Sequence, residues 1–342
     1  MKREPKIVLF VDQYLGTIYA KMAYGVMRYS PDKVICALDS QYAGKNVKDV
    51  TKHPFDVPIV DSIDKAIALG ANTFVLGIAP SGGKLPKKWN LTITEALEKG
   101  MSVWNGLHDG LEQRFGDLAT KPGQRVWDIR RPGFVPKVGS GKAAKLNNKR
   151  VLMIGTDMAI GKMTVGLEMY KALLDNGKNV DFLATGQIGI TITGKGIPLD
   201  AFIVDQASGA VEKIVIEAAD KDIVIVEGQG SLLNPASTAT LPLMRGSCPT
   251  HLVLCHKAKK THLTQFEDIA IPDLKEFIKL NEAVSSVCGS LPKAKCIGVA
   301  LNTSELSEEE AINEIKKLES ELQLPVTDVV RYGATKLIKE LN

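Results

Sequence analysis

Short apolar segments alternate with longer amphipathic segments along almost the whole chain. In the first half, the strand-like runs and helical patterns fall at residues 6–11, 17–29, 34–38, 63–69, 73–77, 91–98 and 101–104. Apolar runs of four to six residues predict buried strands, whereas hydrophobic positions spaced three or four apart predict helices. Because parallel strands need crossover connections, this alternation predicts an α/β domain with a parallel sheet covered on both faces.

The alternation stops once, between residues 131 and 150, where Pro, Gly and Lys are frequent. It then resumes with strands and helices predicted at 151–154, 162–176, 180–184, 205–219, 223–227, 251–255, 272–279, 296–301, 308–322 and 326–330. A break of this composition is typical of a boundary between domains. We therefore predict a Rossmann-like domain at 1–135, a linker at 136–149 and a second α/β domain at 150–342.

The second domain opens with an apolar strand, a loop bounded by Gly155 and Gly161, and a helix that begins at Lys162. Glycine lets the backbone turn its N–H groups inward, the start of the helix adds partial positive charge, and lysine adds a full charge. This pattern predicts a P-loop NTPase-like domain that binds phosphate. The predicted cofactor-binding residues are Gly155, Thr156, Asp157, Gly161, Lys162, Met163, Thr164 and, at a later strand end, Asn302.

The loop departs from the commonest P-loop in two ways. Five residues separate its glycines instead of four, and Thr164 follows Lys162 by two positions instead of one. Met163 occupies the place of the usual magnesium-binding hydroxyl and cannot coordinate magnesium. Magnesium is therefore expected only if the reaction uses ATP, with Glu227, Asp157 and Thr164 as its ligands.

Glu227 ends the apolar strand 223–227 and precedes Gly-Gln-Gly-Ser. In P-loop proteins, a strand-end acid of this kind holds the metal or its water; the alternative is an acid that caps the next turn. The predicted catalytic residues are Glu227, Lys162 and Asp205, and His256 is a further candidate for the base.

Substrate-binding residues are predicted at three positions. Gln187 and Gln229 are flanked by glycines, which let the backbone approach a ligand closely. Arg245 suits a substrate carboxylate, because a guanidinium group binds carboxylate through two parallel hydrogen bonds. Asn302 follows the strand 297–301, at a position where P-loop proteins contact the purine ring. The alternative is that this Asn only forms a turn.

The first domain lacks the glycine signature of a dinucleotide site. Residues 12–16 after its first strand read Asp-Gln-Tyr-Leu-Gly, and Asp39 after the second strand is only half of that signature. NAD binding is therefore not expected. The loop 77–83, Gly-Ile-Ala-Pro-Ser-Gly-Gly, either faces a ligand or forms an ordinary turn.

Composition narrows the class of protein. Forty-three Lys and Arg against 39 Asp and Glu give a net charge of +4, too small a surplus to indicate nucleic acid as a partner. No apolar run approaches the ~18 residues that cross a bilayer, so we expect a cytoplasmic protein without a membrane partner. Five cysteines without a CxxC pair predict reduced thiols, four of them in the core. Because such domains often pair through exposed helices, we expect a homo-oligomer.

Several of these motifs together resemble a family of two-domain bacterial and archaeal proteins. The resemblance lies in residues 106–111, 128–132, 155–164, 184–189, 226–232 and 246–249, and so spans nearly the whole chain. Members of that family are assigned as D-glutamate N-acetyltransferases that use acetyl-coenzyme A, although many carry the label of NAD-dependent epimerase or dehydratase. The resemblance implies an N-acetyltransferase acting on D-glutamate or a related D-amino acid.

The second domain is also similar to dethiobiotin synthetase, which uses ATP and magnesium and shares the Gly-Thr-Asp opening, the five-residue gap and the Val-Glu-Gly strand end. This similarity implies an alternative, an ATP- and magnesium-dependent ligase that activates a carboxylate. A nucleotide-binding regulator without catalytic activity is the other alternative. One departure is that residues 233–235 read Leu-Asn-Pro, where the family tends to read His-Pro.

Overall fold

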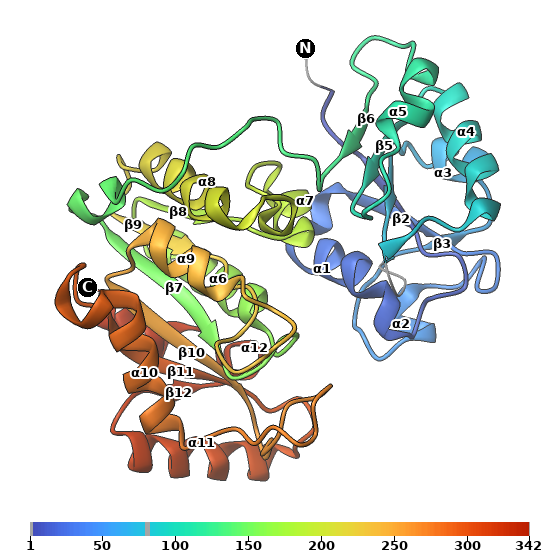
Figure 1. The fold of residues 1–342 in the computed structure, drawn as a ribbon. Helices are drawn as coiled ribbons and strands as arrows, with labels where there is room; N and C mark the ends of the chain where they lie inside the picture. Colours follow the sequence, from blue (N-terminus) through green and yellow to red (C-terminus); the bar gives the residue numbers. More distant parts are fainter. Residues whose placement is uncertain (1–2, 79–82, 342) are drawn as a thin grey trace. The chain divides into compact units, whose positions relative to one another are not determined.

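The computed structural model describes residues 3–78 and 83–341. Its contacts divide the chain into two compact units, residues 1–133 with 190–194 and residues 134–189 with 195–342. Each unit contains one six-stranded sheet in which every paired strand is parallel (Figure 1). The predicted α/β class with two parallel sheets is confirmed.

The sheet of the first unit has the order β3-β2-β1-β4-β5-β6. Strands are added outward from β1 on one side up to β3, and the chain then crosses to the other side of β1 to add β4, β5 and β6. This is the order of a Rossmann-type sheet. Its strands are β1 Ile7–Phe10, β2 Val34–Leu38, β3 Ile59–Val60, β4 Thr73–Leu76, β5 Ser102–Asn105 and β6 Val126–Asp128. The sequence pattern missed β3 and β6, because two or three residues are too few to show a period.

Helices α1 Lys21–Tyr29, α2 Val47–Val50, α3 Ile63–Ala68, α4 Asn90–Glu98 and α5 Glu112–Phe115 complete the first unit. Side-chain caps define where several of them begin, as at α3, where Ser62 accepts a hydrogen bond from the N–H of Lys65. Aromatic packing closes the core beside β1, where the ring of Phe10 lies 5.1 Å from that of Phe74 and 5.3 Å from that of Trp89.

The turn after β1 is held by acids instead of glycines. Asp12 and Gln13 have φ of +27° and +71°, which is uncommon for side-chain-bearing residues. The carboxylate of Asp39, which is fully buried, accepts the N–H groups of Gln13 and Gln41 at 2.9 Å each. Both oxygens of Asp39 therefore stabilise the protein's own backbone, in place of the ribose hydroxyls that such an acid binds in dinucleotide sites.

The sheet of the second unit has the order β12-β11-β10-β7-β9-β8. Its strands are β7 Lys149–Gly155, β8 Val180–Leu183, β9 Ile223–Val226, β10 His251–Lys257, β11 Lys295–Asn302 and β12 Val326–Thr327. The predicted strand 326–330 was wrong beyond Thr327, since a short helix, α12 Val329–Tyr332, follows directly. Asp328 ends the strand, because its carboxylate accepts the N–H groups of Val330 and Arg331 and so caps that helix.

The other helices of this part of the chain are α6 Lys162–Asp175, α7 Gln187–Thr193, α8 Val204–Glu217, α9 Thr240–Ser247, α10 Leu274–Ser286, α11 Glu308–Leu322 and α13 Thr335–Ile338. The prediction for α11 is confirmed to the residue, because Ser307 and Glu310 form a complete capping box. The predicted end of α10 at residue 279 was too early. Asn281 continues the helix by donating from Nδ2 to the carbonyl of Phe277.

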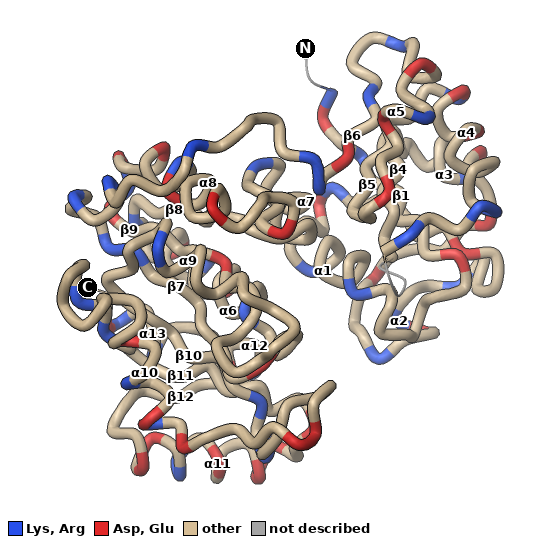
Figure 2. Tube along the Cα trace, viewed as in Figure 1, with Lys and Arg blue, Asp and Glu red and all other residues tan. Residues whose placement is uncertain are grey.

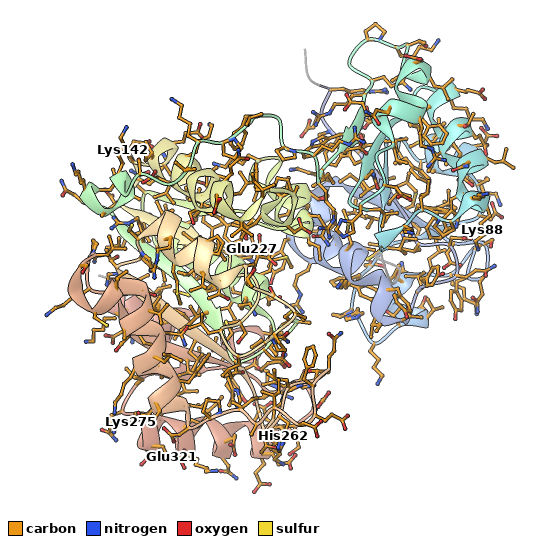
Figure 3. The ribbon with its side chains drawn as sticks, in the orientation of Figure 1. Lys88, Lys142, Glu227, His262, Lys275 and Glu321 are labelled. Carbon is orange, nitrogen blue, oxygen red and sulfur yellow. The ribbon has the colours of Figure 1, made fainter. Side chains whose placement is uncertain are left out.

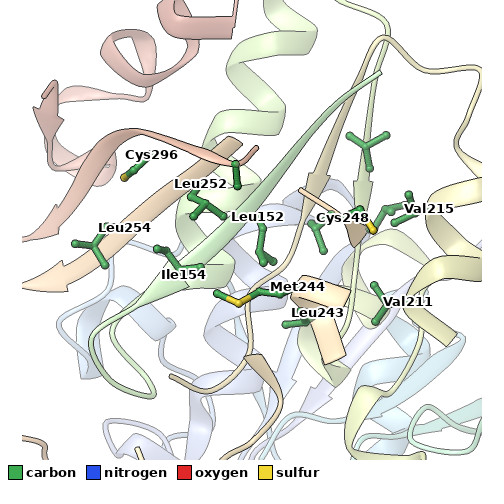
Figure 4. Packing of buried hydrophobic residues seen from close by; sticks show 14 of the residues in the cluster. Leu152, Ile154, Val211, Val215, Leu243, Met244, Cys248, Leu252, Leu254 and Cys296 are labelled. Carbon is green, nitrogen blue, oxygen red and sulfur yellow. The ribbon is translucent and has the colours of Figure 1, made fainter. Parts of the chain in front are cut away.

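The core of the second unit lies between β7, β10 and the helices α8 and α9. Leu152, Ile154, Leu252 and Leu254 point from the two strands toward Met244 of α9 and its neighbours (Figure 4). Among the cysteines, the four expected in the core are buried and one is exposed; the buried ones are Cys36, Cys248, Cys255 and Cys296, and the exposed one is Cys288.

The segment predicted as a linker packs along α8. A Cβ atom on Gly209 would lie 1.7 Å from the carbonyl oxygen of Lys137, so only glycine admits the segment there. Glu212 then accepts the N–H and Oγ of Ser140 at 2.7 and 2.8 Å and the N–H of Ala143 at 3.3 Å. These contacts fix the chain immediately before β7.

Charged residues of both signs are interspersed along both units (Figure 2), in keeping with the small net charge. Across residues 3–78 and 83–341, no helix combines the length and apolar character needed to cross a bilayer.

Candidate functional site

The loops after β7, β9, β10 and β11 leave the second sheet at the same edge, because all of these strands are parallel. This carboxyl edge is where α/β sheets bind ligands. Most residues that the sequence singled out lie in these loops. The polypeptide after β7 supplies the backbone of the candidate site, and the side chains come from the neighbouring strand ends.

The loop between β7 and α6 presents unpaired backbone donors. It turns through Ala159 and Gly161, which have φ of +54° and +114°. Within the described part of the chain, the N–H groups of residues 159–164 have no hydrogen-bond partner, and the first helical bond runs from Val165 to Gly161. A helix start with unsatisfied donors of this kind binds anions, because the donors and the helix dipole both favour negative charge.

Lys162 lies inside this loop and is only 7% exposed. Its Nζ donates to the carbonyl of Asp157 at 2.6 Å, and burial lowers its pKa from the ordinary lysine value. Two glycines make room for its side chain. A Cβ atom would lie 3.1 Å from Nζ at Gly155, and at Gly228 it would lie 2.9 Å from Cδ and 1.8 Å from the carbonyl oxygen of Met153. The ammonium group and the unpaired N–H groups thus belong to one loop.

Asp157 fixes the loop to two distant segments. Its Oδ1 accepts the N–H of Met158 at 2.7 Å and Nδ2 of Asn234 at 2.9 Å. Its Oδ2 accepts the N–H and Oγ1 of Thr264, each at 2.9 Å, and lies 3.5 Å from Nζ of Lys260. Burial opposes ionisation, but these hydrogen bonds outweigh it and hold the pKa of Asp157 below its usual value. The sequence did not identify Thr264 as part of the site.

Thr156 attaches the start of the loop to β10. Its N–H donates to the carbonyl of Cys255 at 3.2 Å, and its Oγ1 lies 2.9 Å from Nδ1 of His256. Burial, aided by the charge of Lys260, lowers the pKa of His256 to about 4. The imidazole is therefore neutral at neutral pH, with one nitrogen engaged by the loop.

Glu227 follows β9 and is 3% exposed (Figure 3). Its Oε2 accepts the N–H groups of Thr185 and Gly186 at 2.7 and 3.1 Å. Burial nevertheless raises the pKa of Glu227 to about 7. A Cβ atom on Gly189 would lie 2.6 Å from Oε2, so this glycine is needed for the carboxyl group to fit. A buried carboxyl group of this pKa can exchange a proton near neutral pH.

Other predicted residues also reach this edge. The amide of Gln229 lies against Gly186, where a Cβ atom would be 2.5 Å from Nε2, and Gln187 begins α7 directly after. Asn302 joins the loop, because its Nδ2 donates to the carbonyl of Ile160 at 3.3 Å. Met163 and Thr164 are half-buried in the first turn of α6.

Two predicted residues are not brought to the loop by the described contacts. Asp205 is exposed in the first turn of α8. Arg245 lies in the last turn of α9 and donates from Nη1 to the carbonyl of Val284 in α10 at 2.8 Å. Since β10 begins shortly after α9, this arginine lies at the amino edge of the sheet, opposite the loop. That placement argues against its predicted contact with a substrate carboxylate.

The described residues contain no group of three or more His, Cys, Asp or Glu side chains arranged to hold a metal ion. Of the three expected magnesium ligands, Asp157 already accepts four hydrogen bonds from the protein. Met163 stands at the usual hydroxyl position. The edge is therefore better suited to binding an anion through backbone donors than to binding a metal through side chains.

Comparisons with known proteins agree with the two-domain architecture. The P-loop domain of a family described as a domain of unknown function, DUF1611, matches residues 137–338, and its Rossmann-like N-terminal domain matches residues 40–132. Two proteins named D-glutamate N-acetyltransferase, from Pseudoalteromonas sp and Tritonibacter scottomollicae, are 35% and 33% identical over 100% and 99% of this chain, and over 100% and 98% of their own lengths. A DUF1611 family protein of known crystal structure, from Anabaena variabilis, is 41% identical and matches 98% of this chain and 99% of its own with a TM-score of 0.92.

Proposed function

This chain belongs to the DUF1611 family, and from that premise we propose that it transfers an acetyl group from acetyl-coenzyme A to the amino group of D-glutamate. Two full-length relatives carry that activity in their names. The structural observation that carries the proposal is the loop after β7, in which the N–H groups of residues 159–164 have no partner among the described residues and Lys162 is buried with its Nζ on the carbonyl of Asp157. The pyrophosphate of coenzyme A is a polyanion of the kind that such a loop binds.

In this proposal the nucleotide part of acetyl-coenzyme A lies on Gly161, Lys162 and Thr164. We assign the contact with the purine ring to Asn302; its hydrogen bond to the carbonyl of Ile160, which joins it to the loop, supports this assignment. Asp157 and Thr156 support the loop through hydrogen bonds to neighbouring segments, and in this proposal they do not contact the cofactor. Asp157 therefore positions the loop and does not bind magnesium.

The reaction requires a proton acceptor. D-glutamate enters with an ammonium group, which must lose a proton before its nitrogen attacks the thioester carbonyl. The new C–N bond then forms, the C–S bond breaks, and the nitrogen loses a second proton to become the amide. The departing thiolate takes up one proton, so that one proton is released to solvent overall. Glu227 is suited to receive the first proton and to supply the one that the thiolate takes up, because its pKa is about 7. Gln229 lies against Gly186, whose N–H donates to Glu227, and Gln187 follows Gly186 in the chain; in this proposal both orient the substrate.

The test is product analysis with the full-length protein, acetyl-coenzyme A and D-glutamate, with L-glutamate, D-aspartate and D-glutamine as comparators. We expect N-acetyl-D-glutamate and one free thiol per product, without ATP or magnesium. Formation of ADP only in the presence of a carboxylate would support the ligase instead. Tight nucleotide binding without turnover of either cofactor would support a regulator.

A further inference from the structure

The carboxyl edge of the first sheet joins two segments that the proposed reaction has not used, residues 106–111 and 128–132. They follow or end β5 and β6, which are parallel neighbours, so both leave the sheet at the same edge. Asn105 donates from Nδ2 to Oδ1 of Asp128 at 2.8 Å and accepts the N–H of Ile129 at 2.9 Å. The two segments therefore form one structure.

Asp128 organises this structure through its buried carboxylate. Besides Asn105, it accepts the N–H of Leu111 at 2.9 and 3.0 Å and the N–H of Glu112 at 3.0 Å. Nε of Arg131 is farther away, at 3.5 Å. Most of the charge of Asp128 is thus used to hold the backbone after β5.

Three basic side chains lie on this scaffold. Arg130 is half-buried and donates from Nε to the carbonyl of Gly106 at 2.7 Å, which fixes the plane of its guanidinium group. Arg131 is 43% exposed and lies across Gly110, where a Cβ atom would be 1.8 Å from Nη2. His108 is exposed, and its pKa is lowered by partial burial and then by the charge of Arg130, which indicates that the two groups are near each other.

We propose that Arg130, Arg131 and His108 form a binding site for a small dicarboxylate on the first unit. Guanidinium groups bind carboxylates through paired, charge-assisted hydrogen bonds, and two adjacent arginines suit a ligand with two carboxylates. The carboxyl edge of a doubly wound sheet is also the usual place for a ligand. The carboxylate chemistry rests on these three residues and goes beyond the proposed acetyl transfer.

Calorimetry with glutarate tests the site, because glutarate has two carboxylates but no amino group to acetylate. The full-length protein is compared with the Arg130→Gln, Arg130→Lys and Arg125→Gln variants. Arg125 is the matched control, since it precedes the amino end of β6 and stacks on Trp127 at 4.6 Å. We expect Arg130→Gln to raise the Kd for glutarate about tenfold or more, Arg130→Lys to raise it less, and Arg125→Gln to leave it unchanged.

Controls separate this site from the rest of the molecule. The Kd for coenzyme A should stay unchanged in all three variants, and thermal unfolding checks that each is folded. If Arg130→Gln does not fold, Arg131→Gln must raise the Kd for glutarate. Failure of the wild-type protein to bind millimolar glutarate, or an equal Kd in folded Arg130→Gln, overturns the proposal.

The site and the proposed activity can fail separately. If the wild-type protein acetylates D-glutamate but does not bind glutarate through Arg130, the site is wrong and the activity stands. If glutarate binds through Arg130 but D-glutamate is not acetylated, the activity is wrong and the carboxylate site stands.

Discussion

The two parallel sheets have the same number of strands, but the backbone N–H groups in the turn after the first strand are paired differently in each. After β7, the N–H groups of residues 159–164 have no partner among residues 3–78 and 83–341, and Lys162 is one of these loop residues. After β1, Asp39 accepts the N–H of Gln13, and the carboxylate of Asp12 contacts the indole N–H of Trp89 and the ammonium group of Lys88.

This difference shows that topology alone does not make a phosphate site. What decides is whether the backbone donors at the strand end are left for a ligand or used by an acid of the protein. In the first unit, the proposed ligand contacts come instead from guanidinium side chains after β6. The carboxyl edge thus carries main-chain donors in the second unit and side-chain donors in the first. The two proposed sites can therefore be tested by separate substitutions.

The largest effect is expected from removing the charge of Lys162 inside the loop after β7. Lys162→Met should lower kcat/KM for acetyl-coenzyme A by about 10²-fold or more, because its ammonium group is the only full charge proposed on the phosphates. Lys171→Met is the matched control, being an exposed lysine on the same helix. Equal losses in both variants, or none in Lys162→Met, would show that the loop does not bind the cofactor.

Glu227→Gln should lower kcat by about 10²-fold or more, because the base is lost. In the wild-type protein, kcat should rise as the pH passes about 7, where Glu227 becomes ionised. Rate measurements from pH 5 to 9 check this; a flat profile in the wild-type protein would exclude Glu227 as the base.

Stability provides a second measurement on Glu227. Its folded pKa is raised to about 7 from 4.5, so the folded state binds the proton more tightly than the unfolded state. The resulting stability is complete below about pH 4.5 and is lost as the pH rises through about 7, by an amount of about 3 kcal/mol. The Tm advantage of Glu227→Gln over wild type should therefore grow between pH 5 and 8, over the same range in which the wild-type kcat rises.

Asp157→Asn should have a smaller effect on the same loop. The amide retains one acceptor oxygen but turns NH₂ toward a donor, either Asn234 or Thr264, so the loop loses part of its support. We expect KM for acetyl-coenzyme A to rise about tenfold, equivalent to one or two lost hydrogen bonds. Asp175→Asn, an exposed acid at the end of α6, serves as control. Magnesium-dependent activity that Asp157→Asn abolishes would instead identify Asp157 as a metal ligand.

The smallest effect on catalysis is expected from the turn after β1. Trp89→Phe removes the indole N–H that contacts Asp12 but keeps a ring beside Phe10. Unfolding free energy should fall by about 1–3 kcal/mol, while the Kd for coenzyme A stays unchanged. A weakened coenzyme A affinity in this variant would mean that the two strand ends are not independent in function.

Local patterns in the sequence were sufficient for much of the fold. The alternation of apolar runs and helical patterns predicted the class and the bounds of α11, where the structure shows a capping box at Ser307. The loop around Lys162 could also be predicted from the sequence, because an anion-binding turn needs its glycines and its lysine close together in the chain. Four buried cysteines followed from their apolar neighbours in the same way.

Tertiary structure decided what depends on distant partners. Asp157 could be recognised as part of the loop, but its bond to Thr264 joins residues 107 positions apart, and no local pattern encodes that contact. Arg245 and Arg130 are equally good carboxylate ligands as residue types. Their difference arises only from packing, which leaves Arg245 at the amino edge of one sheet and Arg130 at the carboxyl edge of the other, because ligand sites form where strand ends converge.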